Sequence, residues 1–259
     1  MGDPVIIKLG YDGDLREEFR GYVKRLNYKV PIEIECEDAA YPLRQTNLVY
    51  SAKEVSLKQC LNILLKGVQI GYCVDLKLKN VVVNNKTAYW LMGWLKSTYG
   101  LTVFFDVEGR LYVCRPFDVI SDAVKYRFRY NVIKDGDMKY ISGDDIRLNV
   151  KAICFNRDGE KIEGKIGDDG GEQKTLYFYD VSSVAELKML AETELKRYKY
   201  DGYRGKIKTF LQPFAMPCMV AELEDPVYPE RSGRYFIESV DVRFGTSGAR
   251  RIVEIGMKV

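Results

Sequence analysis

The C-terminal part of the chain reads MVAELEDPVYPERSGRYFIESVDVRF (residues 219–244), followed shortly afterwards by RIVEIG (residues 251–256). An apolar strand is followed by an acidic loop with turn residues, a second strand with a Gly-x-hydrophobic start, and a closing strand with the pattern V-E-I. Apolar segments bounded by Gly, Pro and Asp are typical of β-strands. This stretch therefore predicts a mainly β architecture.

The N-terminal part shows the same order of features. It reads VIIKLGYDGDLREEFRGYVKRL (residues 5–26) and then IEIEC (residues 32–36). From this pattern we expect strands at 4–11, 18–26 and 31–38. The similarity between the N-terminal and C-terminal segments has two open interpretations. One β-unit was duplicated, or two short strand patterns coincide by chance.

Two amphipathic helices and a hairpin are predicted between about residues 51 and 117. Ser56 begins a capping-box pattern, and an apolar stripe at helical spacing follows it. A second helix is expected at 87–99, ending at Gly100, and 101–115 is expected to form a hairpin. The core face of the second helix is expected to contain Trp90, Leu91, Trp94 and Leu95.

The second half returns to strands and contains one more helix. Strands are expected at 125–133, 145–156, 160–166 and 174–181. Ser183 begins another capping box, and Gly202 is expected to cap the C-terminal end of the helix. The apolar residues at helical spacing are Val184, Leu187, Ala191, Leu195 and Tyr198.

The stretch RYKYDGYRGKIKTF (residues 197–210) contains five basic residues, one acid and three tyrosines. Such a composition raises the question of a nucleic-acid surface. A structural interpretation is favoured, in which the first bases complement the dipole at the end of the helix. In this interpretation, Arg204, Lys206 and Lys208 form the solvent face of the strand that follows.

The amino-acid composition excludes several kinds of binding and catalytic site. The 259 residues include 40 basic and 37 acidic ones, so the net charge of +3 disfavours a uniformly basic, nucleic-acid-coating protein. The absence of histidine removes histidine-activated nucleophiles and HExxH zinc sites, and no glycine-rich nucleotide loop is present. The six cysteines form no CxxC pair and are expected to be buried, reduced thiols. We therefore expect no catalytic residue, no cofactor and no metal site.

Three segments together resemble the phage late control D family, the baseplate hub proteins of contractile tails. They are DPVIIKLGYDG…EFRGYVKRL…IECED (within residues 3–38), LAETELKRYKYDGYRGKI (residues 190–207) and PVYPERSGRYFIESVDVRFGTSGARRIVEIG (residues 226–256). Mu-like and T4-type hubs and the hub portion of type VI secretion spike proteins share this architecture. The resemblance covers nearly the whole chain, although its motifs are turn and strand patterns and not a catalytic signature.

The resemblance implies two related β-barrels of the split-barrel type plus a small helix-hairpin module. We expect the first barrel portion at 1–50, the α+β insert at 51–117, and the second barrel at 118–259 with one long helix (183–200). The last segment could also complete the first barrel. Hubs of this kind are homotrimers whose six barrels form a ring, which adapts a six-fold tail tube to a three-fold spike.

The implied partners are further copies of the chain, a tail tube protein and a separate spike protein, with nucleic acid only as cargo in the lumen. The implied location is the virion tail baseplate, after assembly in the cytoplasm of a bacterial host. No signal-peptide pattern and no bilayer-length apolar run occurs, so no membrane anchor is expected. The first strand begins almost at once, whereas hubs usually have strands before this point. Either the chain is truncated or its first barrel closes differently.

Aromatic and arginine residues in the family-like C-terminal motif are the candidates for subunit contacts, since these types are enriched at interfaces. They are Tyr228, Arg231, Tyr235, Arg250 and Arg251. In the alternative interpretation, Tyr228 shapes a loop and the last two arginines are ordinary edge-strand charges. Two other functions are weighed against a hub, which are a barrel that binds single-stranded nucleic acid and a carboxylate-dependent glycan hydrolase.

Overall fold

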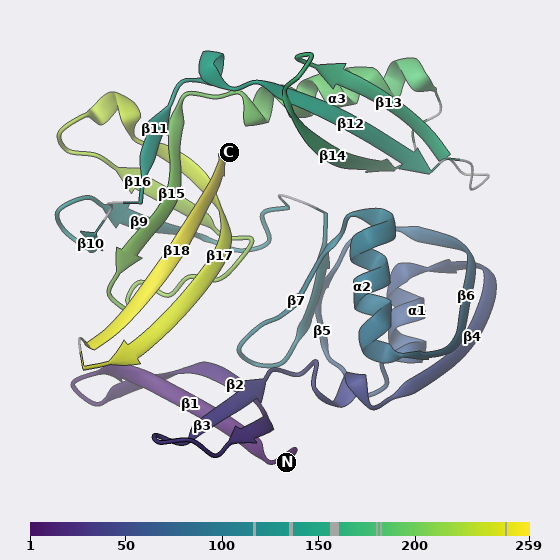
Figure 1. Cartoon of the computed structure of the whole chain (residues 1–259). Helices are drawn as coiled ribbons and strands as arrows, with labels where there is room; N and C mark the ends of the chain where they lie inside the picture. Colours follow the sequence, from purple (N-terminus) through teal and green to yellow (C-terminus); the bar gives the residue numbers. More distant parts are fainter. Residues whose placement is uncertain (116–117, 135–136, 156–160, 180, 182, 247) are drawn as a thin grey trace. The chain divides into compact units, whose positions relative to one another are not determined.

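The computed structural model describes residues 1–259 except 116–117, 135–136, 156–160, 180, 182 and 247. The chain divides into two compact units, Met1–Asp118 and Val119–Val259 (Figure 1). Over these described residues the protein is mainly β, with three α-helices. Among the described residues, no helix is both long and apolar enough to cross a bilayer.

The first unit begins with an open antiparallel sheet of three strands. These are β1 (Pro4–Tyr11), β2 (Asp14–Asn27) and β3 (Glu33–Glu37), in that order. The tight β1–β2 turn requires positive φ at Asp12 and Gly13. Within the described residues, β1 and β3 pair only with β2, so a closed barrel is not seen in this unit.

The rest of the first unit is a small α+β module. It contains β4 (Asn47–Ser56), α1 (Leu57–Leu64), β5 (Ile70–Cys73), β6 (Lys77–Thr87), α2 (Ala88–Tyr99), β7 (Thr102–Phe105) and β8 (Leu111–Cys114). The long strands β4 and β6 pair antiparallel, while β8 pairs with β5 in parallel and with β7 antiparallel. The predicted hairpin at 101–115 is therefore confirmed.

The module repeats one β-α-β pattern. The strand before each helix ends in an N-cap, Ser56 or Thr87, whose side chain accepts a hydrogen bond from the third residue on. The buried positions of α1 (57, 60, 61 and 64) recur at the same spacing in α2 (88, 91, 92 and 95). The core prediction for α2 is half right, because Leu91 and Leu95 are buried while Trp90 and Trp94 are half-buried and stack on each other.

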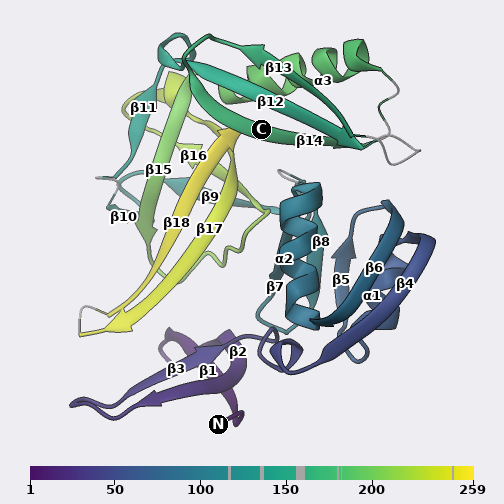
Figure 2. The same cartoon turned by 45° about the vertical axis from the view of Figure 1, so that its right-hand side comes forward.

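The second unit contains a nearly closed barrel. Its strands follow the order β10 (Val132–Lys134), β15 (Gly202–Thr209), β18 (Gly248–Lys258), β17 (Gly233–Gly245), β16 (Val220–Glu224) and β9 (Ala123–Arg127). A bridge between Phe128 and Val132 joins the two ends of this order, and β11 (Lys139–Ile141) adds to β15. Strands β17 and β18 form a long hairpin (Figure 2). Apolar residues fill the interior, including Tyr126, Ile207, Ile237 and Val253.

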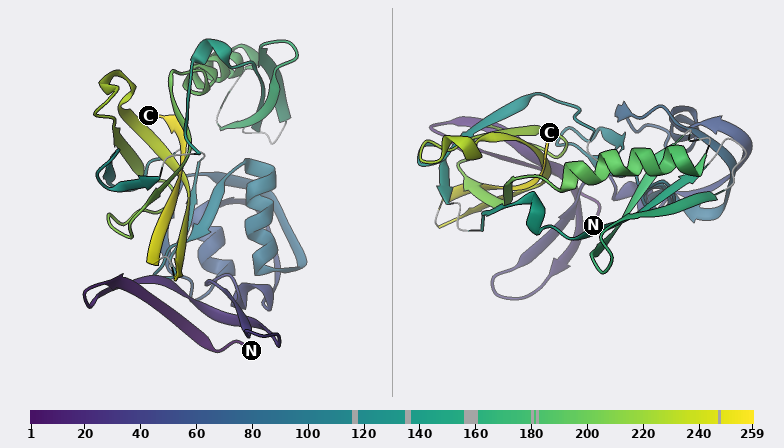
Figure 3. Two further views of the ribbon diagram at one scale, coloured as in Figure 1. Left: turned by 60° about the vertical axis from the view of Figure 1, so that its left-hand side comes forward. Right: turned by 90° about the horizontal axis from the view of Figure 1, so that it is seen from above.

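The same unit also contains a three-stranded sheet covered by a helix. The strands are β12 (Leu148–Phe155), β13 (Lys161–Gly167) and β14 (Glu172–Tyr179), and α3 (Val184–Tyr198) lies on one face of the sheet (Figure 3). Residues 156 and 160, at the ends of two predicted strands, lie outside the described residues. Leu187, Ala191 and Tyr198 are buried as predicted, but Val184 at the first turn is 48% exposed.

The expected role of Gly202 is wrong. Lys199 caps α3, and Gly202 is the first residue of β15. A Cβ at Gly202 would lie 2.5 Å from the Tyr200 ring and 3.0 Å from the Tyr235 ring. Glycine is therefore needed here for close packing inside the barrel, not for helix termination.

The two segments that match in sequence also match in topology. Strands β1, β2 and β3 form an antiparallel three-stranded meander, and so do β16, β17 and β18. The middle strand β2 makes register shifts with both of its neighbours, and the middle strand β17 makes them with β18. The second meander is closed into a barrel by three further strands, whereas the first is open among the described residues.

Candidate contact site

The five candidate contact residues occupy two places on the barrel. Tyr228 and Arg231 lie in the loop between β16 and β17, the second of them in the short helix η3 (Pro229–Arg231). Tyr235 lies near the start of β17, and Arg250 and Arg251 lie near the start of β18. The structure brings Tyr228, Arg231 and Tyr235 together and places the last two arginines toward the tip of the β17–β18 hairpin.

Asp225 organises the loop after β16. Its side chain is only 6% exposed and accepts hydrogen bonds from the Tyr203 hydroxyl at 2.5 Å and from the backbone N–H groups of Val227 and Tyr228 at 2.9 and 3.0 Å. Its own N–H donates to the Ser232 hydroxyl at 2.9 Å. The carboxylate of Asp225 therefore fixes the start of the loop, and its backbone N–H fixes the end at Ser232.

The surroundings of Asp225 favour the charged form of its carboxylate. Burial alone would raise the pKa of Asp225, but the hydrogen bonds from Tyr203, Tyr228 and Val227 lower it below the usual value. Burial, together with donation to the carboxylate, raises the pKa of Tyr203 to about 12. Near neutral pH the contact is therefore a protonated tyrosine that donates to an ionised aspartate.

Arg231 lies between two tyrosines at the same end of the barrel. Its guanidinium carbon is 4.0 Å from the centre of the Tyr228 ring and 4.9 Å from that of Tyr140 in β11. Tyr228 is 46% exposed and Tyr140 is also exposed, so the cluster is accessible from solvent. An arginine flanked by aromatic rings has the composition of an interface hot spot.

Tyr235 supports this cluster from inside and is not exposed. Its hydroxyl accepts a hydrogen bond from the Tyr203 N–H at 3.2 Å and donates to the Arg231 carbonyl at 3.3 Å. The expectation of an accessible Tyr235 is wrong, because odd-numbered residues at the start of β17 point into the barrel. Tyr235 positions the loop that presents Arg231.

Arg250 and Arg251 point to opposite faces of β18. Arg251 is 1% exposed, and its Nε and Nη1 donate to the carbonyls of Leu211 and Ala215 at 3.1 and 3.2 Å. Arg250 faces outward, with its guanidinium 5.6 Å from the centre of the Phe210 ring. Arg251 is therefore a core residue and not an exposed contact. The edge-strand interpretation is wrong for both arginines, since β18 lies between β15 and β17.

Sequence reasoning missed Asp225, Tyr203 and Tyr140. The only local signal was Asp225 before Pro226, which reads as an ordinary turn. Tyr203 lies in β15 and Tyr140 in β11, on strands distant in sequence from Asp225, so their convergence depends on the barrel register.

The structure confirms the structural interpretation of the basic stretch at 197–210. Arg197 pairs with Glu194 in α3, Lys199 with Asp168, and Lys206 with Glu254 on the outer face of the barrel. The Arg204 guanidinium donates to the Tyr198 carbonyl. These bases do not form a continuous cationic track.

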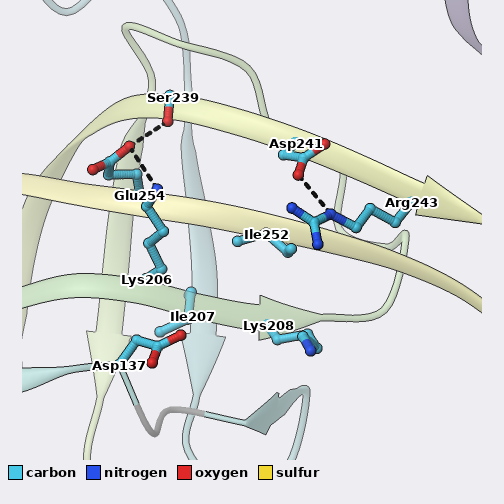
Figure 4. Close-up of a pocket in the computed structure, with 9 residues that line it drawn as sticks. All are labelled: Asp137, Lys206, Ile207, Lys208, Ser239, Asp241, Arg243, Ile252 and Glu254. Atoms are coloured by element: carbon cyan, nitrogen blue, oxygen red, sulfur yellow. Dashed lines mark hydrogen bonds and ion pairs between the residues drawn. The ribbon is translucent and has the colours of Figure 1, made fainter.

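A hollow of about 220 Å³ lies on the outer face of β15, β18 and β17 (Figure 4). Ser239 and Lys206 both approach Glu254, at 2.6 and 3.5 Å, and Arg243 approaches Asp241 at 2.7 Å. Charges of both signs therefore alternate around the hollow. Within the described residues, no cluster of three or more Cys, Asp and Glu side chains could hold a metal ion.

The fold is similar to that of two solved tail proteins. One is a tail protein from Neisseria meningitidis MC58, with a TM-score of 0.61, 14% identity, and coverage of 93% of this chain and 81% of that one. The other is the 43 kDa tail protein of prophage MuSo2 from Shewanella oneidensis, with a TM-score of 0.59, 13% identity, and coverage of 98% and 88%. No protein-family model and no curated protein matches the sequence.

Proposed function

We propose that this protein is a structural hub of a phage tail baseplate or a related contractile injection machine. The observation that carries the proposal is the similarity in fold to two tail proteins over nearly the full length of both chains. The late control D-like motifs in the first and last strands support the same conclusion. In this role the protein acts by assembly and not by turnover, at the tail baseplate built inside a bacterial host.

The proposed assembly is a homotrimer that contacts a tail tube protein on one side and a separate spike protein on the other. Support comes from the two related meanders, β1–β3 and β16–β18, because a trimer that docks on a six-fold tube needs two similar faces in each chain. Further support comes from the exposed cluster of Tyr228, Arg231 and Tyr140, which has the composition of a protein interface. The first barrel would be completed in the assembled state.

The solution mass tests this proposal. Light scattering on a sizing column, across concentration and at low and high salt, should give a species near three times the 29.8 kDa chain mass. The variant Arg231→Ala should shift the equilibrium toward monomer by about thirtyfold or more, as expected for a hot-spot arginine. Arg197→Ala, which removes an exposed arginine of α3 away from this cluster, is the control and should leave the mass unchanged. A strict monomer at high concentration would contradict the trimer.

A further inference from the structure

The positive charge of the chain is concentrated in the α+β module of the first unit. From Asn47 to Arg115 the sequence contains nine basic and four acidic residues, which gives this segment a charge of +5, against +3 for the whole chain. Residues 76–105 contain four lysines and no acidic residue. A local excess of positive charge attracts polyanions even where the chain as a whole is nearly neutral.

Most of the lysines in this segment are not compensated. The pairs Lys77–Glu54, Arg110–Asp106 and Arg110–Glu108 use three of its four acids. The remaining lysines have no carboxylate within ion-pair distance among the described residues. They are Lys53, Lys58, Lys66, Lys79, Lys86 and Lys96. Their charge is therefore available to a ligand.

Helix α2 carries aromatic rings and lysine on its solvent side. Leu91 and Leu95 are fully buried and hold the helix on the module. We name the opposite side, together with the exposed lysine just before the helix, the α2 face. It consists of Lys86, Tyr89, Trp90, Gly93, Trp94 and Lys96. Lysines interleaved with accessible aromatic rings are typical of surfaces that bind nucleic acid.

The carboxylate of Glu37 is linked to the α2 face through Arg44 and is compensated. The Arg44 guanidinium lies 3.5 Å above the centre of the Tyr89 ring, and its Nε donates to Glu37 at 2.7 Å. Lys24 approaches the same carboxylate at 3.5 Å. Two cations therefore contact one carboxylate, so this edge of the α2 face adds no net negative charge.

The indole N–H groups of the two tryptophans are not used by the fold. The half-buried rings of Trp90 and Trp94 stack with their centres 6.1 Å apart and an angle of 18° between their planes. Neither indole N–H has an acceptor among the described residues. An indole N–H that is partly withdrawn from water usually finds an acceptor. A ligand that stacks on these rings and supplies acceptor oxygens satisfies both groups.

Gly93 leaves an opening beside the two rings that the fold does not require. Glycine is unfavourable in the middle of a helix, and Gly93 has no positive φ that would demand it. A Cβ at this position would meet no atom within 4 Å. The bare backbone therefore leaves room for a flat group beside Trp90 and Trp94.

We propose that the α2 face binds single-stranded nucleic acid. Bases stack on Trp90 and Trp94, and the opening over Gly93 admits the strand. Lys86 and Lys96 contact its phosphates. The bases must be unpaired, because bases in a duplex stack on one another and do not reach aromatic side chains. This activity goes beyond the proposed hub and does not depend on it.

A protein partner and a membrane fit the same face less well. Lysine is depleted in protein interfaces and arginine is enriched, whereas residues 47–115 contain seven lysines and only two arginines. A helix binds a membrane surface by inserting its apolar side, but the apolar side of α2 is buried in the module. Lysine contacts to phosphates, with bases on aromatic rings, use the groups that α2 exposes.

Tryptophan fluorescence tests the α2 face directly, because Trp90 and Trp94 are the two tryptophans of the chain. Titration of the full chain with an oligothymidylate of about 12 nucleotides should quench this emission in a saturable way. Binding should weaken as the salt concentration rises from about 50 to about 200 mM. The variant Lys86→Glu with Lys96→Glu should weaken binding by at least about tenfold. It should also lower the slope of log affinity against log salt by about 1.4, since each lost phosphate contact removes ~0.7.

Two further sets of variants separate the site from net charge and from folding. Lys188→Glu with Lys196→Glu makes the same charge change at exposed positions of α3 in the second unit, and it should leave the affinity at the higher salt within about twofold of wild type. Gly93→Gln fills the opening without removing a lysine. It should weaken binding by at least about fivefold, the loss expected for one base that no longer stacks. Its unfolding temperature should stay equal or rise, because Gln has the higher helix propensity. Gly93→Ala also favours the helix but adds only a methyl group, so it should retain most of the binding.

Three results would overturn the assignment. The first is tryptophan emission that does not respond to the oligonucleotide at about 50 mM salt. The second is oligonucleotide binding, followed by the anisotropy of a labelled strand, that is unchanged in both Lys86→Glu with Lys96→Glu and Gly93→Gln. The third is a response to phosphatidylglycerol vesicles without one to the oligonucleotide. The solution mass tests the hub separately, so a trimer that binds no oligonucleotide leaves the hub standing, and a monomer that binds it leaves the α2 face standing.

Discussion

Asp225 is the single residue on which the contact loop depends. Replacement by Ala removes the acceptor for the Tyr203 hydroxyl and for two backbone N–H groups. We expect Asp225→Ala to lower the free energy of unfolding by about 2–4 kcal/mol, the range for losing buried hydrogen bonds to a charged group. Urea unfolding followed by circular dichroism measures the loss. Asp241→Ala, which removes an exposed carboxylate of β17, should change stability by less than about 0.5 kcal/mol.

The Asp225 contribution should also depend on pH in a defined direction. The folded pKa is lowered, so the stabilisation is fully present above the unfolded value near ~3.9 and is lost as the pH falls through the folded pKa. The difference in stability between wild type and Asp225→Ala should therefore be constant from about pH 6 to 8 and should shrink below about pH 4. A difference that is independent of pH down to acid unfolding would contradict an ionised Asp225.

Arg250 and Arg251 form a matched pair, since they are adjacent in sequence and opposite in environment. Arg251→Ala should lower the free energy of unfolding by about 3 kcal/mol or more, because it leaves a cavity and two buried carbonyls without their donors. Arg250→Ala should stay within about 0.5 kcal/mol. Thermal unfolding of the two variants at one pH compares them directly. Equal effects would mean that the strand alternation in β18 is misassigned.

At the scale of elements, each of the three α-helices begins at a hydroxyl N-cap. In α3 the Ser183 hydroxyl accepts from the Glu186 N–H at 3.2 Å. Ser183→Ala should therefore cost about 1 kcal/mol, whereas Ser183→Gly should cost only a few tenths. Thr193→Ala on the exposed face of the same helix is the control, and it should be neutral or slightly stabilising because Ala has the higher helix propensity. Chemical unfolding of the three variants ranks their losses in free energy of unfolding. If Ser183→Ala causes no loss, the cap is not formed in solution.

The sequence predicted these elements well where the signals are local. Ser56, Ser183 and Gly100 mark helix ends through side-chain or backbone geometry a few residues away, and their predicted roles are confirmed. Non-local features were not predictable in this way. The parallel pairing of β9 with β16 and of β12 with β14 depends on strands that are far apart in the chain.

The unpredicted burial of two contact candidates has the same origin. Whether Tyr235, Arg250 or Arg251 faces the core is decided by strand register, and a shift of one residue reverses every side chain. Composition alone predicted exposed contacts for all of them. The structure keeps Tyr228, Arg231 and Arg250 on the surface and places Tyr235 and Arg251 in the interior.

At the scale of the whole molecule, the chain divides between Asp118 and Val119 into units that each contain their own buried residues. All strands of the barrel, from β9 to β18, belong to the second unit. We therefore expect the fragment 119–259 to fold on its own, with a cooperative urea transition and a β-rich circular dichroism spectrum.

A shorter fragment provides a stringent control for this independence. The fragment 132–259 lacks β9 and so loses the parallel pairing with β16, the Phe128–Val132 bridge and the buried rings of Tyr126 and Phe128. Removing these rings and opening the barrel between β16 and β10 exposes core surface and unpaired strand edges, which should abolish cooperative unfolding and cause aggregation. If 119–259 fails to fold while the full chain unfolds in one transition, the two units are thermodynamically coupled. If 132–259 folds as well as 119–259, β9 is not needed to close the barrel.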